Sequence, residues 1–182
     1  MENVLGNSVD IKRIVYDRET IEKKIALLGK TITDDYKDKE LIVIGVIKGS
    51  LYFFSDLTQA IDLPIKIDMI GFGNIPDTTS KTGVDKITKD IDIEISGKHV
   101  LIVEDVIRTG LTTAYLISCL EGKNPKDIAI ATLLLNPDRL LMTIPVKYYG
   151  FEINDSWLIG YGMDVHEIGR NLPYIAELNR KQ

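Results

Sequence analysis

The clearest chemical signal is a pair of adjacent carboxylates, Glu104 and Asp105, directly after the apolar run Val100–Val103. The run is short and mostly β-branched, which predicts a buried strand. Side chains alternate along a strand, so two consecutive acids at its end point in opposite directions. A carboxylate without a partner is too costly to bury in an apolar core. We therefore expect Glu104 and Asp105 to face a ligand or a metal ion.

The residues that follow combine a glycine with hydroxyl groups at the predicted start of a helix. They are Arg108, Thr109, Gly110, Leu111 and Thr112. Backbone N–H groups at a helix start lack partners within the helix, and the helix dipole adds positive potential, so such a turn binds phosphate. One segment could then hold a sugar's hydroxyl groups with its acids and a phosphate with its amides. Helix capping alone is the structural alternative, but it does not account for the paired acids after a buried strand.

An alternation of strands and helices must position these residues. Short apolar runs predict strands at 41–47, 65–70, 100–103, 128–134, 146–151 and 157–161. Apolar residues at helical spacing predict helices over 18–36, 51–61 and from about residue 112. This order predicts an α/β fold, a mostly parallel sheet flanked by helices. Ligands of such sheets bind beyond the carboxyl ends of the strands, where 48–50 and 104–112 would meet.

Residues 71–90 differ from the rest of the chain, because Gly, Pro, Thr, Ser, Asp and Lys predominate and apolar residues are few. A polar stretch of this length inside a compact domain is uncommon and usually forms a lid or a binding loop. We predict a mobile lid loop over about 71–90 that closes over the site and excludes water.

Composition sets limits on the class of protein. With 182 residues, the chain is predicted to be a single domain over 1–182. The net charge of −5 argues against nucleic-acid and membrane-surface partners. One cysteine and two histidines argue against a metal site built from Cys or His. No apolar run approaches the ~20 residues that cross a bilayer, and the start of the chain has no secretory signal, so we expect a cytoplasmic protein.

Four segments resemble a known family. Val100–Thr112 is similar to the phosphoribosyl-pyrophosphate motif of the type I phosphoribosyltransferases. Over nearly its whole length, the chain resembles the bacterial hypoxanthine(-guanine) phosphoribosyltransferases. Ile47–Ser50 is similar to the pyrophosphate loop of that family, Gly150–Asp164 to its purine- and metal-binding stretch, and Arg170–Ile175 to its C-terminal end. The four segments occur in the family's order.

The resemblance implies transfer of a 5-phosphoribosyl group from phosphoribosyl pyrophosphate to a 6-oxopurine: hypoxanthine, guanine or xanthine. The products would be a nucleoside monophosphate and pyrophosphate. It also implies Mg²⁺ as cofactor, a type I fold with a small hood built partly from terminal segments, and a homodimer or homotetramer. No nucleic acid and no membrane are implied as partners.

The resemblance also implies roles for individual residues. Glu104, Asp105 and Arg108 would be catalytic, and Asp164 would hold Mg²⁺ together with Glu104 and Asp105. Trp157 offers a flat face for the purine. The implied substrate-binding residues are Lys48, Gly49, Thr109, Gly110, Leu111, Thr112, Asn136, Trp157, Leu158 and Arg170.

Three departures from the family concern the base. At the position of Arg108, the family has an aspartate that accepts the N7 proton of the purine. An arginine cannot accept this proton. At the position of Asn136, the family has a lysine that contacts the 6-oxo group of the purine. The asparagine amide can still donate a hydrogen bond there but carries no charge. Arg139 is a candidate substitute for that lysine. The lid usually carries a serine–tyrosine pair where this chain has Gly71 and Phe72.

These departures leave three interpretations open. In the first, the enzyme works with altered base recognition, and Arg108 favours a purine that binds as its anion, such as xanthine. In the second, catalysis is impaired and the protein mainly binds nucleotide. In the third, the chain is an RNA-binding regulator similar to the pyrimidine-operon attenuators, which also resemble phosphoribosyltransferases. The negative net charge and the purine-binding stretch around Trp157 argue against the third.

Overall fold

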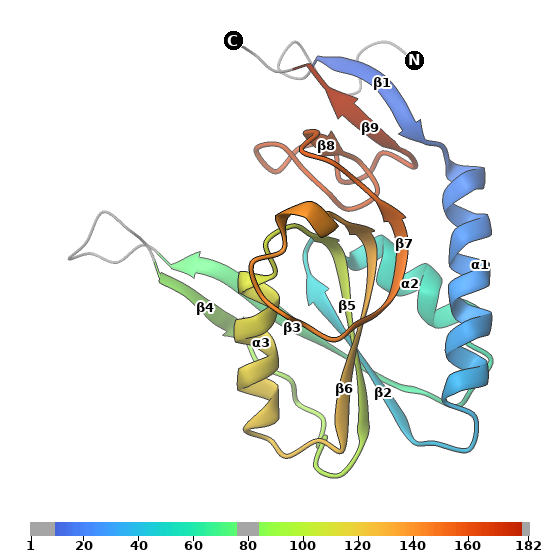
Figure 1. Ribbon diagram of the computed structural model, residues 1–182, viewed down its shortest axis with the longest axis vertical. Coiled ribbons are helices and arrows are strands. Elements are labelled where there is room, and N and C mark those ends of the chain that lie inside the picture. The colour runs from blue at the N-terminus through green and yellow to red at the C-terminus, as the bar shows by residue number, and fades with distance from the viewer. Residues whose placement is uncertain (1–9, 76–83, 180–182) are drawn as a thin grey trace.

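The computed structural model describes residues 10–75 and 84–179, which form a layered α/β structure below a small second sheet (Figure 1). In this described part, six strands make the main sheet, in the order β4-β3-β2-β5-β6-β7. Their bounds are β2 Leu41–Ile47, β3 Lys66–Ile75, β4 Val84–Lys89, β5 His99–Ile107, β6 Asp127–Leu135 and β7 Val146–Glu152. Neighbouring strands run parallel except β4, which is antiparallel to β3. The predicted mostly parallel sheet is confirmed.

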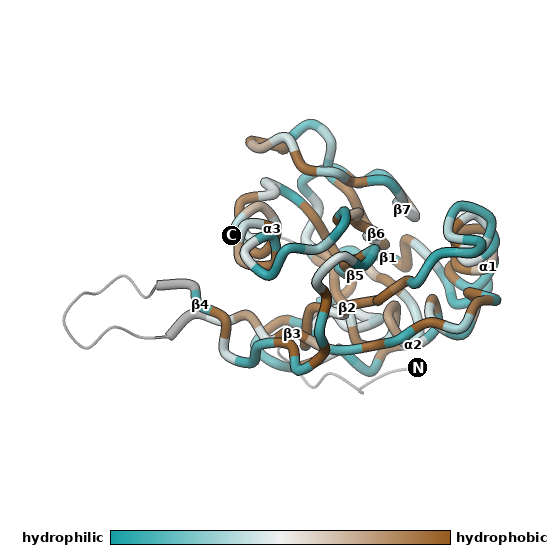
Figure 2. The backbone as a smooth tube through the Cα atoms, turned by 90° about the horizontal axis from the view of Figure 1, so that it is seen from below, coloured by the Kyte–Doolittle hydropathy of each residue, from teal (hydrophilic) through white to brown (hydrophobic). Residues whose placement is uncertain are grey.

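Helices cover both faces of this sheet. Helices α1 (Arg18–Asp35) and α2 (Leu51–Ala60) pack on one face, and α3 (Leu111–Glu121) packs on the other (Figure 1). Buried strand residues therefore meet apolar side chains on both sides, which explains why β2 and β5 are continuous apolar runs rather than alternating ones. Figure 2 shows hydrophobic stretches inside the molecule and hydrophilic residues along the outer side of α1.

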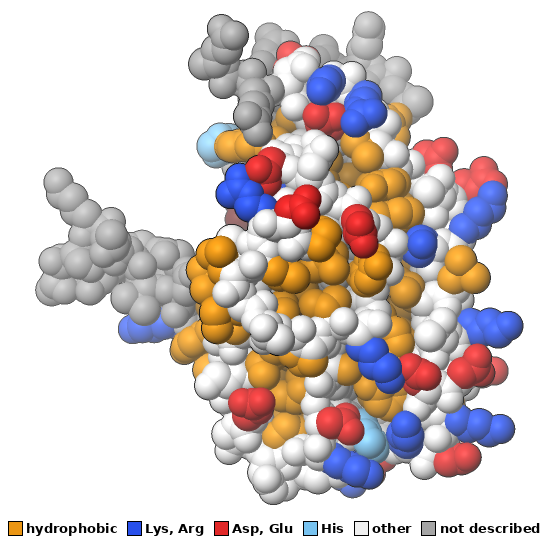
Figure 3. Space-filling view, viewed as in Figure 1, with side chains coloured by type: hydrophobic (Ala, Val, Ile, Leu, Met, Phe, Trp, Pro, Cys, Tyr) orange, Lys and Arg blue, Asp and Glu red, His pale blue; other side chains and the backbone are white. Residues whose placement is uncertain are grey.

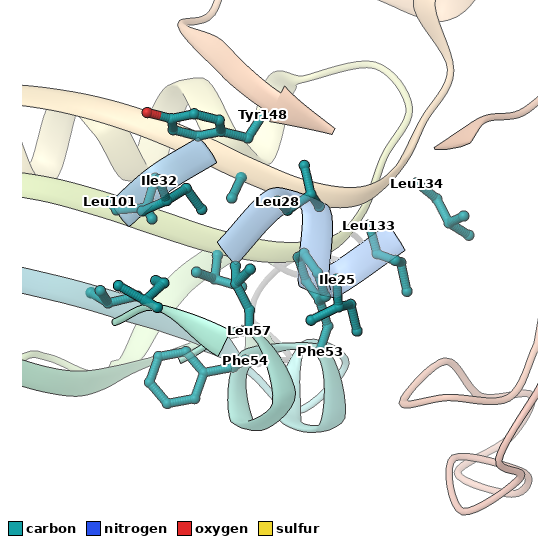
Figure 4. Close-up of a cluster of buried hydrophobic side chains, with 14 of the residues drawn as sticks. Ile25, Leu28, Ile32, Phe53, Phe54, Leu57, Leu101, Leu133, Leu134 and Tyr148 are labelled. Atoms are coloured by element: carbon teal, nitrogen blue, oxygen red, sulfur yellow. The ribbon is translucent and has the colours of Figure 1, made fainter. Parts of the chain in front are cut away.

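Helix α1 shows how local sequence produces this packing. The Asp17 carboxylate accepts a hydrogen bond of 2.8 Å from the Thr20 N–H, so it caps the helix. A stripe at helical spacing faces the sheet and is buried: Ile21, Ile25, Leu28 and Ile32. Figure 4 shows part of this cluster, where the stripe meets Phe53 and Leu57 of α2. Burial of each such side chain contributes about 1.5–3 kcal/mol.

A hood stands above the carboxyl ends of the main strands (Figure 1). It is a three-stranded antiparallel sheet in the order β1-β9-β8, with β1 Ile11–Tyr16, β8 Leu158–Ile159 and β9 Ile175–Leu178. Because β1 and β9 come from opposite ends of the described chain, the predicted hood from terminal segments is confirmed.

Strand β5 is longer than its apolar run predicts. The prediction ended the strand before Glu104, but β5 continues to Ile107, with Glu104 paired to Thr132 of β6. The pairing of β5 with β2 ends earlier, at Val103 opposite Gly45. Residues beyond Val103 are therefore bonded to β6 alone, and this side of the strand opens toward the hood.

The segment predicted as a lid loop over 71–90 has strands at its two ends, and its role as a lid stays a prediction. Gly71–Ile75 belongs to β3 and 84–89 form β4, so these residues make an antiparallel hairpin arm. Residues 76–83 lie outside the described residues. The hairpin was missed because its apolar anchors are sparse: Phe72 is paired with Ile87 and contacts the Tyr115 ring of α3, with ring centroids 5.7 Å apart.

None of the helices in the described ranges has both the length and the apolar character that a membrane crossing requires.

Candidate active site

The two acids lie where β2 and β5 separate. Glu104 is only 7% exposed, and its carboxylate accepts a hydrogen bond of 3.3 Å from the Thr113 hydroxyl on α3. Burial is the main cause that raises the pKa of Glu104 to about 8, and the neighbouring Asp105 adds to the effect. Burial also raises the pKa of Asp105. Two adjacent carboxyl groups with raised pKa values, one buried and one half-buried, mark a candidate functional site.

The raised pKa of Glu104 predicts a pH dependence of stability. Between the ordinary value of 4.5 and about 8, the folded protein binds more protons than the unfolded chain. The free energy of unfolding therefore falls as pH rises through this window, by roughly 3–5 kcal/mol for a group shifted this far. Denaturant titrations with a chelator and no substrate, at pH 5.5 and pH 9, should show a smaller fall in Glu104→Gln than in wild type. Identical falls would contradict the account.

Three chain segments meet closely beside the second acid. A Cβ atom at Gly49 would overlap the Asp105 carboxylate, so the loop after β2 lies directly on this acid. A Cβ at Gly162 would in turn overlap the backbone carbonyl of Gly49. Gly162 has φ +101°, a conformation that favours glycine. The glycines therefore allow the loop at Lys48 and the segment before Asp164 to close around Asp105. The peptide bond between Ile47 and Lys48 is cis.

The turn between β5 and α3 has an open helix start. Gly110 is the N-cap with φ +75° and has no side chain to cap the helix, while the Thr109 hydroxyl accepts a long hydrogen bond of 3.5 Å from the Leu111 N–H. The first helical hydrogen bond runs from the Ala114 N–H to the Gly110 carbonyl, so the amides before Ala114 point out of the helix start. Leu111 and Thr112 are exposed there. The Thr109 carbonyl accepts from the Leu141 N–H at 3.0 Å, which anchors the turn to the segment between β6 and β7.

A group of ionic side chains lies on the hood side of Gly49. Arg170 forms an ion pair of 2.7 Å with Asp164, and it donates to the Gly162 carbonyl at 2.8 Å. Lys48 forms an ion pair of 3.1 Å with Glu167, whose carboxylate also lies 3.3 Å from Arg170. Both cations lower the pKa of Glu167. The positive charge of Arg170 also lowers the pKa of Asp105, against the effect of burial. This interaction connects the ionic group to the acid pair.

A second part of the site is a cavity of about 520 Å³ beside the hood. Its lining comprises Arg108, Thr109, Arg139, Asp155, Trp157, Leu158, Asp164, Val165 and His166. Trp157 is 62% exposed and Leu158 begins β8. Arg108 donates to the backbone carbonyls of Ser156 at 2.8 Å and Asn154 at 3.4 Å. Its guanidinium therefore fixes the loop that precedes the tryptophan.

Asn136 and Arg139 both bind Asp155. Arg139 forms two parallel hydrogen bonds with this carboxylate, and Asn136 donates to it at 3.2 Å. Asn136 is fully buried, and its side-chain oxygen has no partner among the described residues. The three residues also line a cleft of about 740 Å³ below the hood. In Figure 3, acidic and basic side chains lie side by side where the hood meets the main sheet, above a broad hydrophobic area.

The structure therefore brings nine of the predicted residues together in two adjoining groups, while Glu104 packs against Thr113 and Asn136 against Asp155. Lys48, Gly49, Asp105, Asp164 and Arg170 form one group, and Arg108, Thr109, Trp157 and Leu158 line the cavity with Asp164. Sequence reasoning missed three residues: Thr113, Asp155 and Glu167. Thr113 lies on the face of α3 that turns toward β5, and its place on that face could have been predicted from the helical spacing. Nothing in the spacing of Asp155 or Glu167 indicates its partners.

Comparison with known proteins shows which family the chain resembles. A family model described as a phosphoribosyl transferase domain matches residues 13–166. The hypoxanthine-guanine phosphoribosyltransferase of Dictyostelium discoideum is 38% identical over 174 residues, which cover 93% of this chain and 97% of that protein. The protein of the same name from Bacillus subtilis is 38% identical over 169 residues, covering 93% and 94%. A solved structure of such an enzyme from Bacillus anthracis has a TM-score of 0.87 at 37% identity, covering 95% of this chain and 100% of that chain.

Proposed function

Because the chain belongs to the phosphoribosyl transferase domain family, we propose that it transfers the 5-phosphoribosyl group from phosphoribosyl pyrophosphate to a 6-oxopurine. Hypoxanthine, guanine and xanthine are the candidate bases, and the products are the nucleoside monophosphate and pyrophosphate. The observation that carries the proposal is the acid pair, with Glu104 buried and Asp105 half-buried, between the loop at Gly49 and the start of α3. This arrangement offers negative charge to the sugar and donors to the phosphates on either side of it.

The acid pair acts on the sugar. The transition state of the transfer is cation-like at the ribose, and a fixed negative charge nearby lowers its free energy. Asp105 is the acid in contact with the loop at Gly49, so it lies between the expected sugar and the leaving group. Glu104 is held in place by the Thr113 hydroxyl and can accept hydrogen bonds from the ribose hydroxyl groups.

Phosphate groups are bound on both sides of the acids. The amides of Gly110, Leu111 and Thr112, with the Thr109 hydroxyl, bind the 5-phosphate at the uncapped start of α3. Lys48 and Arg170 bind the leaving pyrophosphate, whose negative charge grows as the bond to the sugar breaks. The missing side chain at position 49 leaves room for the Asp105 carboxylate beside this loop.

The residues fit Mg²⁺. This ion takes one or two protein carboxylates and completes its shell with phosphate oxygens and water. Asp164, Asp105 and Glu104 supply hard oxygen atoms. Burial is the main cause that raises the pKa of Asp105, and the nearby Asp164 adds to it. Among the described residues, no three His, Cys, Asp or Glu side chains are grouped so that they could hold a metal ion. When bound, Mg²⁺ supplies positive charge to the leaving pyrophosphate.

The purine lies in the cavity lined by Trp157. The indole face stacks on the base, and the backbone of Leu158 reads the edge of the ring. Arg108 uses two guanidinium N–H groups on loop carbonyls, and its remaining N–H groups can donate to the purine. Because this residue cannot accept the N7 proton, it favours a base that binds as its anion. Xanthine is the candidate base that fits this best.

A panel of bases tests the activity and the base preference together. We expect pyrophosphate release with phosphoribosyl pyrophosphate and Mg²⁺, with kcat/KM for xanthine about tenfold above that for hypoxanthine. The variant Arg108→Asp should shift the preference about tenfold toward hypoxanthine, because a carboxylate can accept the N7 proton. Arg18→Asp, a charge reversal on the outer face of α1, is the matched control. No release with hypoxanthine, guanine or xanthine would contradict the proposed function, and equal rates on all three would contradict the role of Arg108.

The interpretations as an impaired nucleotide-binding homologue or as an RNA-binding regulator receive no support from the relatives. A cytoplasmic location is part of the proposal. A homodimer or homotetramer is the assembly that we propose, and sedimentation of the purified chain tests it.

A further inference from the structure

The ionic group near Gly49 contains an acid that the proposed reaction does not use. One carboxylate oxygen of Glu167, Oε2, lies 3.1 Å from the Lys48 ammonium and 3.3 Å from a terminal nitrogen of Arg170. Lys48 and Glu167 are 119 residues apart in the chain, so this bridge is a product of the fold. These two cations are the ones assigned to the leaving pyrophosphate.

The turn that carries Glu167 is unfavourable for its residue types. His166 and Glu167 have φ values of +53° and +64°, a region that favours glycine and asparagine. The turn is closed by hydrogen bonds of 3.0 and 3.1 Å between the backbones of Val165 and Ile168. The Glu167 N–H also donates to Asp164 at 2.8 Å. Backbone strain of this kind is found at ligand clamps, and here it directs a carboxylate toward two cations.

The bridge is of a kind that a ligand can replace. The side chains of Lys48 and Glu167 are 66% and 65% exposed, and exposed ion pairs are weak. Arg170 is less exposed, at 24%, and its Nε atom is buried without a partner among the described residues. The guanidinium therefore keeps an unused donor while Glu167 contacts only its outer edge. An oxygen of pyrophosphate needs the same N–H donors of Lys48 and Arg170 that Glu167 occupies.

We propose that Glu167 is a positioning residue that takes the place of a pyrophosphate oxygen between Lys48 and Arg170 in the empty site. It holds the two cations close together and leaves them when the diphosphate binds. This inference rests on the proposed function. Its consequence is that Glu167 competes with pyrophosphate, so it weakens the binding of substrate and product and speeds product release.

The variant Glu167→Gln tests the competition, because it keeps the size and backbone of the residue and removes the charge. Calorimetric titration with pyrophosphate and no Mg²⁺ should show about fivefold tighter binding, the change expected for two exposed ion pairs. Pyrophosphate should also inhibit the forward reaction about fivefold more strongly. KM for phosphoribosyl pyrophosphate should fall by a similar factor while kcat does not rise. A titration with Mg²⁺ present shows whether any effect depends on the metal.

Glu19→Gln is the matched control, because Glu19 is an exposed acid that pairs with Lys23 on the outer face of α1. It should leave pyrophosphate binding and KM unchanged. Unchanged or weaker pyrophosphate binding in Glu167→Gln would overturn the inference. A wild-type protein that releases no pyrophosphate with any purine would instead contradict the proposed function, so the two failures can be told apart.

Discussion

Replacing Asp105 with asparagine is expected to lower kcat/KM for phosphoribosyl pyrophosphate about a thousandfold, the upper range for removing one electrostatic contact to a transition state. The amide keeps the shape of the side chain and can still hydrogen-bond to a ribose hydroxyl. It removes the negative charge beside the cation-like sugar. No nearby acid can take over the role of the Asp105 charge, because Asp164 is held by Arg170 and Glu104 lies deeper in the protein.

Stability separates this effect from a folding defect. Burial raises the pKa of Asp105, so the ionised form is costly in the empty site and the neutral amide should unfold no more easily than wild type. Steady-state kinetics and denaturant titrations at neutral pH measure the two quantities. Asp127→Asn is the matched control: this acid lies at the opposite end of the sheet, where it pairs with His99. Activity of Asp105→Asn within tenfold of wild type would refute the role of this charge.

The second large effect is expected for Gly162→Ala. The new methyl group would overlap the backbone carbonyl of Gly49, and the φ of +101° is strained for alanine. Because the obstacle is backbone rather than a flexible side chain, the loop at Gly49 and the segment at Gly162 must move apart. We expect a loss of about 2–4 kcal/mol in the free energy of unfolding and a fall of more than a hundredfold in kcat/KM.

Gly97→Ala provides the comparison, since Gly97 also has positive φ, +68°, but open space around its Cβ position. That variant should lose about 1 kcal/mol of stability, from the left-handed backbone alone, and keep its activity. Thermal unfolding and pyrophosphate release measure both. If Gly162→Ala behaved like Gly97→Ala, the close contact between the two segments would not matter for the site.

Local sequence was sufficient to predict most of the fold. The stripe from Ile21 to Ile32 and the Asp17 cap depend on neighbours in the chain, and so do the apolar strands β2 and β5. The predictions fail where pairing with another strand determines the secondary structure. Strand β5 runs past its apolar residues because β6 continues beside it, and the β3–β4 hairpin pairs from Gly71 opposite Lys89 to Ile75 opposite Val84 with few apolar residues.

The site could be predicted only in part, for the same reason. The acids and the turn before α3 form one continuous segment, so their spacing is visible in the sequence. The contact of Gly49 with Asp105, and the bridge from Lys48 to Glu167, join residues that are far apart in the chain. The hydrogen bonds from Arg108 to the carbonyls of Ser156 and Asn154 also could not be predicted from the spacing of residues in the sequence.

The most direct test of the account is a crystal structure of the protein with a purine nucleoside 5′-monophosphate and Mg²⁺. We expect the phosphate within hydrogen-bond distance of the amides of Gly110, Leu111 and Thr112. The ribose hydroxyl groups should face Glu104 and Asp105, with the base against Trp157. A nucleotide bound elsewhere, with the turn between β5 and α3 left free of phosphate, would contradict the account at its centre.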